Sequence, residues 1–191
     1  MSKKLYIIPG FGETTRGPGY KKIITEIKSC GWEVVPINLK WDRSTTTDWL
    51  KQIEKKVEKG DPENSYIFSF SIGAYLTILL NSKLKFKGYL ICSPSPFFKE
   101  DLPKLPDIAK KVLGTKRWEI FKNFKCPDKL NGKATFIIGD KDLPLAISRT
   151  KNIFKKWKGK KKIIILKDVS HDIANDLYIS TVLKEIKIIS S

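Results

Sequence analysis

Histidine, cysteine and long apolar runs are all scarce in this chain of 191 residues. His171 is the single histidine, which excludes a multi-histidine metal site and leaves one candidate for histidine-dependent chemistry. Three widely spaced cysteines without a CxxC pair exclude a disulfide framework and a cysteine zinc site, and they favour a reducing, cytoplasmic location. No apolar run approaches the roughly 18 residues that a membrane span needs.

Arginine is also scarce, although the chain is strongly basic. Only four of the 37 basic residues are arginines, and the formal net charge is +17. Specific nucleic-acid recognition favours the planar arginine fork, whereas these lysines are spread over the whole chain. We therefore expect a solvated lysine-rich surface with no specific nucleic-acid partner. An acidic protein partner is the alternative that the charge leaves open.

Short apolar runs alternate with helical stretches along the chain. The length and the 41% hydrophobic content predict one domain over residues 1–191. The alternation predicts an α/β fold, a three-layer α/β/α sandwich with about six parallel strands. The expected strands are residues 5–9, 33–39, 66–70, 88–92, 134–139 and 163–166. The expected helices are residues 20–29, 48–59, 72–80, 145–157 and 172–188.

Residues 93–131 interrupt this alternation with five prolines and several aromatics. The segment is too long for an ordinary loop, so it is either a lid-like insertion or a helical connection that packs its aromatics on the sheet. We expect an apolar substrate pocket from its aromatics and from two loop residues near the candidate site. The candidate lining residues are Gly10, Phe97, Phe98, Trp118, Phe121 and Leu143.

Ser71 stands between a buried strand and an apolar helix. A serine at such a sharp strand-to-helix turn exposes its hydroxyl above the end of the strand, and the turn needs small neighbours. Gly73 is the small residue two places later. Ser69 stands two places earlier, where the usual G-x-S-x-G pattern has glycine. The placement predicts a nucleophilic serine at position 71.

A nucleophilic serine needs a base, and the base needs an acid to fix its tautomer. His171 follows the last predicted strand. Asp140 and Asp142 both follow the strand that ends at Gly139, and either could be the acid. Serine, acid and histidine thus come at the carboxyl ends of three different parallel strands, where open α/β sheets bind ligands.

Two backbone N–H groups are expected to stabilise an oxyanion. One belongs to Ile72, the residue after the candidate nucleophile. The other is expected in the glycine-containing loop after the first strand, with Phe11 as the candidate donor. A dinucleotide fingerprint is excluded for this loop because Thr15 stands where the third glycine is needed.

These motifs together resemble the small α/β-hydrolases over nearly the whole chain. The matching segments are Pro9-Gly10-Phe11-Gly12, Ser69-Phe70-Ser71-Ile72-Gly73, Ser93-Pro94, Gly139-Asp140-Lys141-Asp142 and Ser170-His171-Asp172. The pattern looks most like the compact serine hydrolases of the retinoblastoma-binding-protein-nine kind. The resemblance implies an α/β-hydrolase fold that lacks the first two strands, with Ser71 as nucleophile, Asp142 as acid and His171 as base.

The expected activity is hydrolysis of an ester or thioester of a small apolar acyl group through an acyl-enzyme on Ser71. No metal or cofactor is implied. Two alternatives stay open: a non-catalytic binding protein on the same fold, and a hydrolase that acts on acyl groups carried by an acidic carrier protein.

Overall fold

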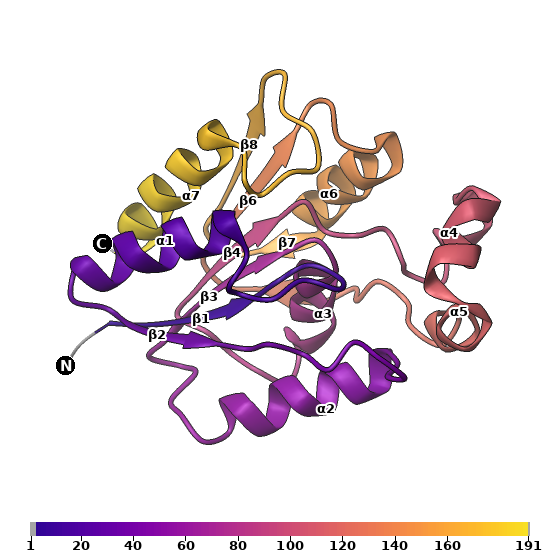
Figure 1. Cartoon of the computed structure of the whole chain (residues 1–191), viewed down its shortest axis with the longest axis horizontal. Helices are drawn as coiled ribbons and strands as arrows, with labels where there is room; N and C mark the ends of the chain where they lie inside the picture. The colour runs from indigo at the N-terminus through magenta and orange to yellow at the C-terminus, as the bar shows by residue number, and fades with distance from the viewer. Residues whose placement is uncertain (1–2, 191) are drawn as a thin grey trace.

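The computed structural model describes residues 3–190 as alternating strands and helices (Figure 1). The elements in chain order are β1 (Lys4–Ile8), α1 (Pro18–Ser29), β2 (Glu33–Pro36), α2 (Thr46–Val57), β3 (Tyr66–Phe70), α3 (Ile72–Leu80), β4 (Gly88–Cys92), η1 (Leu102–Lys104), α4 (Asp107–Leu113), α5 (Thr115–Phe121), β5 (Leu130–Asn131), β6 (Ala134–Gly139), α6 (Pro144–Lys156), β7 (Trp157–Lys158), β8 (Lys161–Leu166) and α7 (Asp176–Ile189).

In the described part of the chain, six strands form a parallel sheet in the order β2-β1-β3-β4-β6-β8. The three central strands β3, β4 and β6 are buried along their whole length, whereas the edge strands β2 and β8 are partly exposed. Continuous apolar runs are typical of strands that are covered on both faces. The predicted parallel sheet is thus confirmed.

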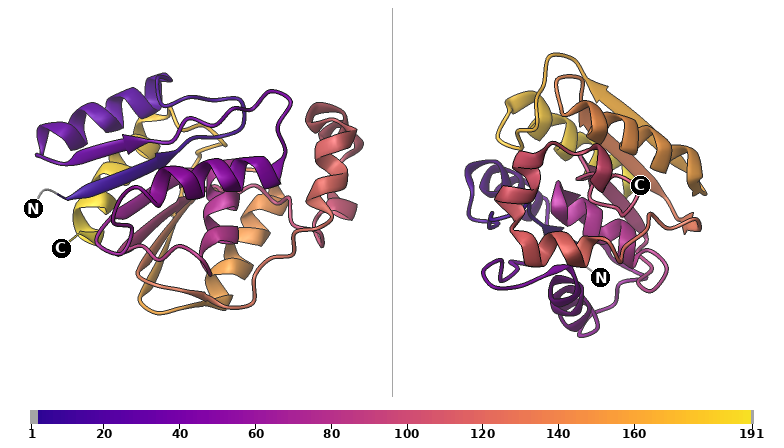
Figure 2. Two further views of the ribbon diagram at one scale, coloured as in Figure 1. Left: turned by 90° about the horizontal axis from the view of Figure 1, so that it is seen from below. Right: turned by 90° about the vertical axis from the view of Figure 1, so that its right-hand side faces the viewer.

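Helices cover both faces of the sheet and make three layers (Figures 1 and 2). Helices α1 and α7 pack together on one face, where Tyr20 and Tyr178 join the core. Helices α2, α3 and α6 lie on the other face, where Trp49, Tyr75 and Phe136 are buried. The three-layer α/β/α prediction is confirmed.

The segment after β4 forms η1, α4, α5 and β5 rather than an extended loop. Helices α4 and α5 stand beyond the carboxyl ends of the strands, at the end of the molecule away from both termini (Figure 2). Phe98 and Phe121 from this segment pack on Tyr75 of α3, with ring centroids 4.8 and 5.7 Å apart. Part of the segment is therefore a helical connection that packs its aromatics on the body of the protein.

Several boundaries differ from those that the sequence predicts. Helix α7 begins at Asp176 rather than at residue 172, because the Asn175 side chain accepts hydrogen bonds from Leu177 N and Tyr178 N and caps the helix there. Helix α1 begins earlier, at Pro18, a residue that suits the first helical turn. The two-residue strands β5 and β7 pair with each other and were not predicted. No helix in residues 3–190 has both the length and the apolar character needed to cross a membrane.

Candidate active site

Ser71 lies at a sharp turn between β3 and α3. Its φ of 56° and ψ of −119° are rare for a residue with a side chain, and its N–H donates to Cys92 O at 2.9 Å. A Cβ on Gly73 would lie 2.5 Å from Ile8 O and 2.6 Å from Pro9 O, so only glycine fits at this position. The start of α3 therefore packs directly against the end of β1, as the strand-to-helix turn requires.

His171 lies between Ser71 and Asp142. Its Nε2 is 2.8 Å from Ser71 Oγ, and its Nδ1 is 3.0 Å from both carboxylate oxygens of Asp142. The Phe70 ring lies 4.9 Å from the imidazole, centroid to centroid, and covers one side of it. Three side chains from separate strand ends thus form one hydrogen-bonded chain.

Asp142 and Asp140 occupy different environments. The Asp142 side chain is fully buried, and its Oδ1 also accepts the N–H of Leu143 at 2.7 Å. Asp140 is exposed, and the two carboxylate oxygens that can accept the histidine Nδ1–H both belong to Asp142. The loop after Gly139 approaches the histidine loop so closely that a Cβ on Gly139 would overlap Val169 O. This close approach places the carboxylate of residue 142 beside the imidazole.

Ser95 is a neighbour of the candidate nucleophile that sequence reasoning missed. Its Oγ is 3.2 Å from Ser71 Oγ, and its N–H donates to Ser71 O at 3.1 Å. Ser95 directly follows Ser93-Pro94, one of the segments that resemble the small α/β-hydrolases. The position of Ser95 just after β4, at the carboxyl edge of the sheet, is the sequence signal that could have identified it. The start of the 93–131 segment is thereby fixed to the strand-to-helix turn.

The loop after β1 lies against Ser71. A Cβ on Gly10 would be 3.3 Å from Ser71 Cβ. The Gly10 N–H donates to Glu13 Oε2 at 2.8 Å and to Tyr20 OH at 3.0 Å, and the Tyr20 hydroxyl donates to the same Glu13 oxygen at 2.6 Å. Burial, followed by the nearby Glu13 carboxylate, raises the pKa of Tyr20 far above its ordinary value, so the phenol remains a donor. Sequence reasoning did not find the role of Glu13 or Tyr20 in this loop.

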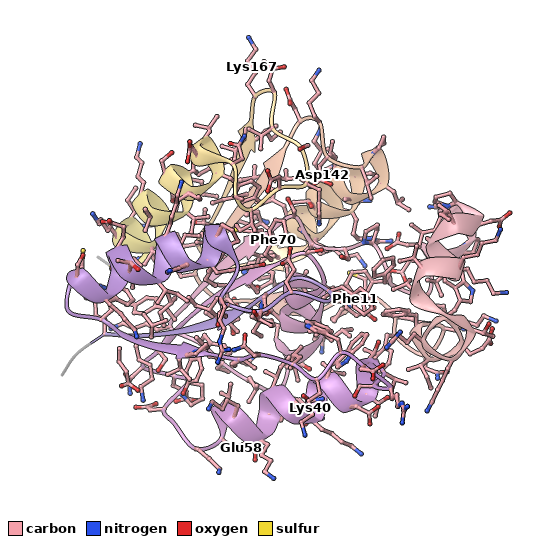
Figure 3. The ribbon with its side chains drawn as sticks, in the orientation of Figure 1. Phe11, Lys40, Glu58, Phe70, Asp142 and Lys167 are labelled. Carbon is pink, nitrogen blue, oxygen red and sulfur yellow. The ribbon has the colours of Figure 1, made fainter. Side chains whose placement is uncertain are left out.

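The two candidate oxyanion donors are free to bind an acceptor. In residues 3–190, neither the Phe11 N–H nor the Ile72 N–H donates a hydrogen bond. The Phe11 side chain is held edge-on by Trp41 and Trp49, with ring centroids 5.5 and 5.8 Å away. In Figure 3, Phe70 lies near the centre of the view with Phe11 and Asp142 to its right, whereas Glu58 and Lys167 lie at the lower and upper margins.

The residues predicted to line a substrate pocket do not form one exposed surface, although the Phe97 and Phe121 rings are in contact, with centroids 5.1 Å apart. Phe98 and Phe121 have no exposed surface, because both are part of the hydrophobic core, so neither can contact a substrate in this conformation. Phe97 and Trp118 are partly buried against the same core, and Leu143 is 60% exposed.

A pocket of about 260 Å³ lies beside the loop that carries His171. Its lining includes Glu13, Gly17, Tyr20, Asp172 and Ile173. These residues come from the loop after β1, the start of α1 and the turn that follows His171. None of the predicted pocket residues lines it, although the Gly10 N–H donates hydrogen bonds to two of its lining residues, Glu13 and Tyr20.

Comparison with known proteins finds similarity of structure alone. No family model matches the chain, and no curated protein matches it in sequence. A candidate hydrolase from Agrobacterium vitis S4 matches with a TM-score of 0.84 and 13% identity, covering 100% of this chain and 88% of that one. Alpha/beta hydrolase domain-containing protein 10 from mouse matches with a TM-score of 0.79 and 12% identity, covering 99% and 90%. The monoacylglycerol lipase of Paleococcus ferrophilus matches with a TM-score of 0.75 and 15% identity, covering 98% and 95%.

These similarities define the class of fold. The chain has the α/β-hydrolase fold, as the sequence motifs predict. The closer resemblance to the compact hydrolases of the retinoblastoma-binding-protein-nine kind stays a prediction.

Proposed function

We propose that this protein is a serine hydrolase that cleaves an ester or thioester through an acyl-enzyme on Ser71. The observation that carries the proposal is the continuous hydrogen-bonded chain from Ser71 Oγ through His171 to the buried carboxylate of Asp142. A serine hydroxyl alone is a poor nucleophile at neutral pH, and an adjacent base that is oriented by an acid activates it.

Ser71, His171 and Asp142 have distinct roles in the proposed reaction. His171 Nε2 accepts the proton of Ser71 Oγ as the oxygen attacks the substrate carbonyl, and later returns the proton to the leaving group. Asp142 holds the proton on Nδ1 and stabilises the imidazolium that forms. Water then attacks the acyl-enzyme with His171 again acting as base, which releases the acid and restores the serine.

The N–H groups of Ile72 and Phe11 are the proposed donors to the tetrahedral oxyanion. Both are free of other acceptors in the described residues, and Gly10 brings the Phe11 loop against Ser71. Removal of one such donor typically costs about 3–4 kcal/mol of transition-state stabilisation. Two donors therefore supply a large part of the rate enhancement.

A small apolar acyl group is the proposed substrate feature. The surroundings of the site are aromatic, with Phe70 against the imidazole and Phe11 against Trp41. Matched structures include the esterase Est1E from Butyrivibrio proteoclasticus and the lipase from Paleococcus ferrophilus, which supports an ester substrate. Residues 93–131 are proposed as a lid-like cover, because α4 and α5 stand beyond the strand ends where the site lies (Figure 2).

Hydrolysis of a series of p-nitrophenyl esters, from acetate to octanoate, tests this function. We expect turnover that is greatest for short acyl chains and that is lost in Ser71→Ala. Ser148→Ala, which removes an exposed hydroxyl from α6, is the matched control and should keep wild-type activity. A folded wild-type protein that turns over none of these esters and no thioester would favour the non-catalytic binding alternative.

A further inference from the structure

We propose that Arg117, on helix α5 of the 93–131 segment, is a positioning residue for the loop that presents the Phe11 N–H. The proposal rests on the proposed function, because it concerns the geometry of a proposed oxyanion donor. It assigns to this segment a second task besides covering the site: holding the loop after β1 in place.

The guanidinium of Arg117 is fixed by three hydrogen bonds. Its Nε donates to Ser44 O at 2.9 Å, its Nη2 to Trp41 O at 2.6 Å and its Nη1 to Leu113 O at 3.1 Å. All three acceptors are backbone carbonyls, two in the 41–44 loop and one at the end of α4. A planar fork can satisfy such divergent acceptors together, whereas a lysine ammonium cannot. Arg117 therefore fastens α5 to the 41–44 loop.

The same guanidinium lies over the side chain of Phe11. Its carbon is 5.3 Å from the Phe11 ring centroid and 5.9 Å from the Trp49 ring. A guanidinium within about 6 Å of an aromatic ring attracts it electrostatically. Trp41 and Trp49 also pack against the Phe11 ring in T-shaped contacts. The partly buried Phe11 ring thus packs against two tryptophans and the Arg117 guanidinium.

A second route leads from Arg117 to the same loop. Arg117 fixes the backbone of Trp41, and the Trp41 indole N–H donates to Glu13 O at 2.8 Å. The Glu13 carboxylate in turn accepts the Gly10 N–H. One route ends on the side chain of Phe11 and the other on the residues that flank it. Both routes converge on residues 10–13.

This convergence matters because an oxyanion donor must be placed to within about 0.5 Å. Hydrogen bonds hold Gly10 and Glu13 at the two ends of the loop, but Gly12 between them has a φ of 75° and open space where a Cβ would lie. The Phe11 N–H makes no hydrogen bond in the described residues, so contacts of the Phe11 ring help to fix its position. Loss of Arg117 would leave the fold of the sheet intact but would let the Phe11 N–H move. Complete loss of one donor costs about 100- to 1000-fold in kcat, so a misplaced donor should cost at least about 10-fold.

The test compares Arg117→Met and Arg117→Lys with the matched control Lys116→Met. Lys116 is the adjacent residue of α5, is exposed and carries the same charge. We expect Arg117→Met to lower kcat for p-nitrophenyl butyrate by at least about 10-fold with KM within about 2-fold. The phosphonylation rate with a fluorophosphonate should fall by a similar factor. Arg117→Lys should resemble Arg117→Met, because the fork is lost in both, and Lys116→Met should behave as wild type.

Wild-type kcat in folded Arg117→Met would overturn the proposal, and so would an increase in KM at unchanged kcat, which would indicate a substrate-binding role. Backbone amide NMR gives a readout that does not depend on activity. Arg117→Met should shift the amide signals of Gly10 and Phe11 and speed the hydrogen exchange of the hydrogen-bonded Gly10 amide, whereas Lys116→Met should do neither. If the Gly10 and Phe11 amides are unchanged in Arg117→Met, the proposal for Arg117 is contradicted, whether or not the protein is a hydrolase. If the wild-type protein is inactive but these amides change in Arg117→Met, only the proposed function is contradicted.

Discussion

Ser69→Ala is expected to stabilise the protein. Ser69 lies in β3, two residues before the proposed nucleophile, and pairs in register with Ile8 and Ile91. It has no exposed surface, and its hydroxyl has no hydrogen-bond partner among the described residues. A buried hydroxyl without a partner costs free energy, and alanine removes it while keeping the Cβ that fills the site.

The expected gain in the free energy of unfolding follows from the cost of burying the Ser69 hydroxyl without a hydrogen bond. Mutational data place an unsatisfied buried polar group at about 1–3 kcal/mol, and the oxygen removed leaves only a small gap. We therefore expect the free energy of unfolding to rise by about 1 kcal/mol. For a chain of this length, that is a rise in Tm of about 2–4 °C.

Denaturant unfolding of Ser69→Ala beside Ser93→Ala measures the effect. Ser93 is equally buried, but its Oγ is 2.8 Å from the Tyr178 hydroxyl, so the same chemical change removes a made hydrogen bond and should destabilise the protein by about 1 kcal/mol. The rate of fluorophosphonate labelling should be unchanged in Ser69→Ala. Equal destabilisation of the two variants would refute the reasoning, because it would mean that the Ser69 hydroxyl is also hydrogen-bonded.

Three further predictions concern the acid, the turn and the surface charge. Asp142→Asn should lower kcat by about 10⁴-fold through loss of the correct histidine tautomer, whereas Asp140→Asn should change it little; steady-state kinetics that rank them in reverse would exchange their roles. Gly73→Ala should lower the free energy of unfolding by about 1–3 kcal/mol, because its Cβ would meet two backbone oxygens at 2.5 and 2.6 Å, and a wild-type melting curve would contradict this. DNA and RNA titrations at about 150 mM salt, where screening extends about 8 Å, should give no sub-micromolar affinity; tight binding that survives there would assign the +17 charge a function.

The sequence predicts the sheet well because its signals are local. The central strands are continuous apolar runs, and the helices between them carry apolar faces that a linear pattern reveals. Boundaries were missed where the deciding signal was a single residue, as with Pro18 at the start of α1 and Asn175 before α7. The β5–β7 pair was missed because a two-residue strand has no period to detect.

The sequence predicts those residues of the candidate site that the order of the strands alone brings together. Ser71, Asp142 and His171 each follow a parallel strand, so the fold places them at one edge. Arg117 lies more than 70 residues from the carbonyls of the 41–44 loop that it binds, and no local pattern encodes such a contact. The sequence predicts Phe98 and Phe121 as pocket residues because an apolar side chain in an insertion can face either a substrate or the core. In the structure both side chains pack on Tyr75 and belong to the core.

Mass-spectrometric mapping of a fluorophosphonate adduct tests the central claim most directly, because the probe reacts with an activated serine whatever the natural substrate is. The account predicts one adduct on the wild-type protein, located at Ser71, and no adduct on folded Ser71→Ala or on folded His171→Ala. An adduct on another serine, or a folded wild-type protein that never reacts, would contradict the assignment of Ser71 as an activated nucleophile.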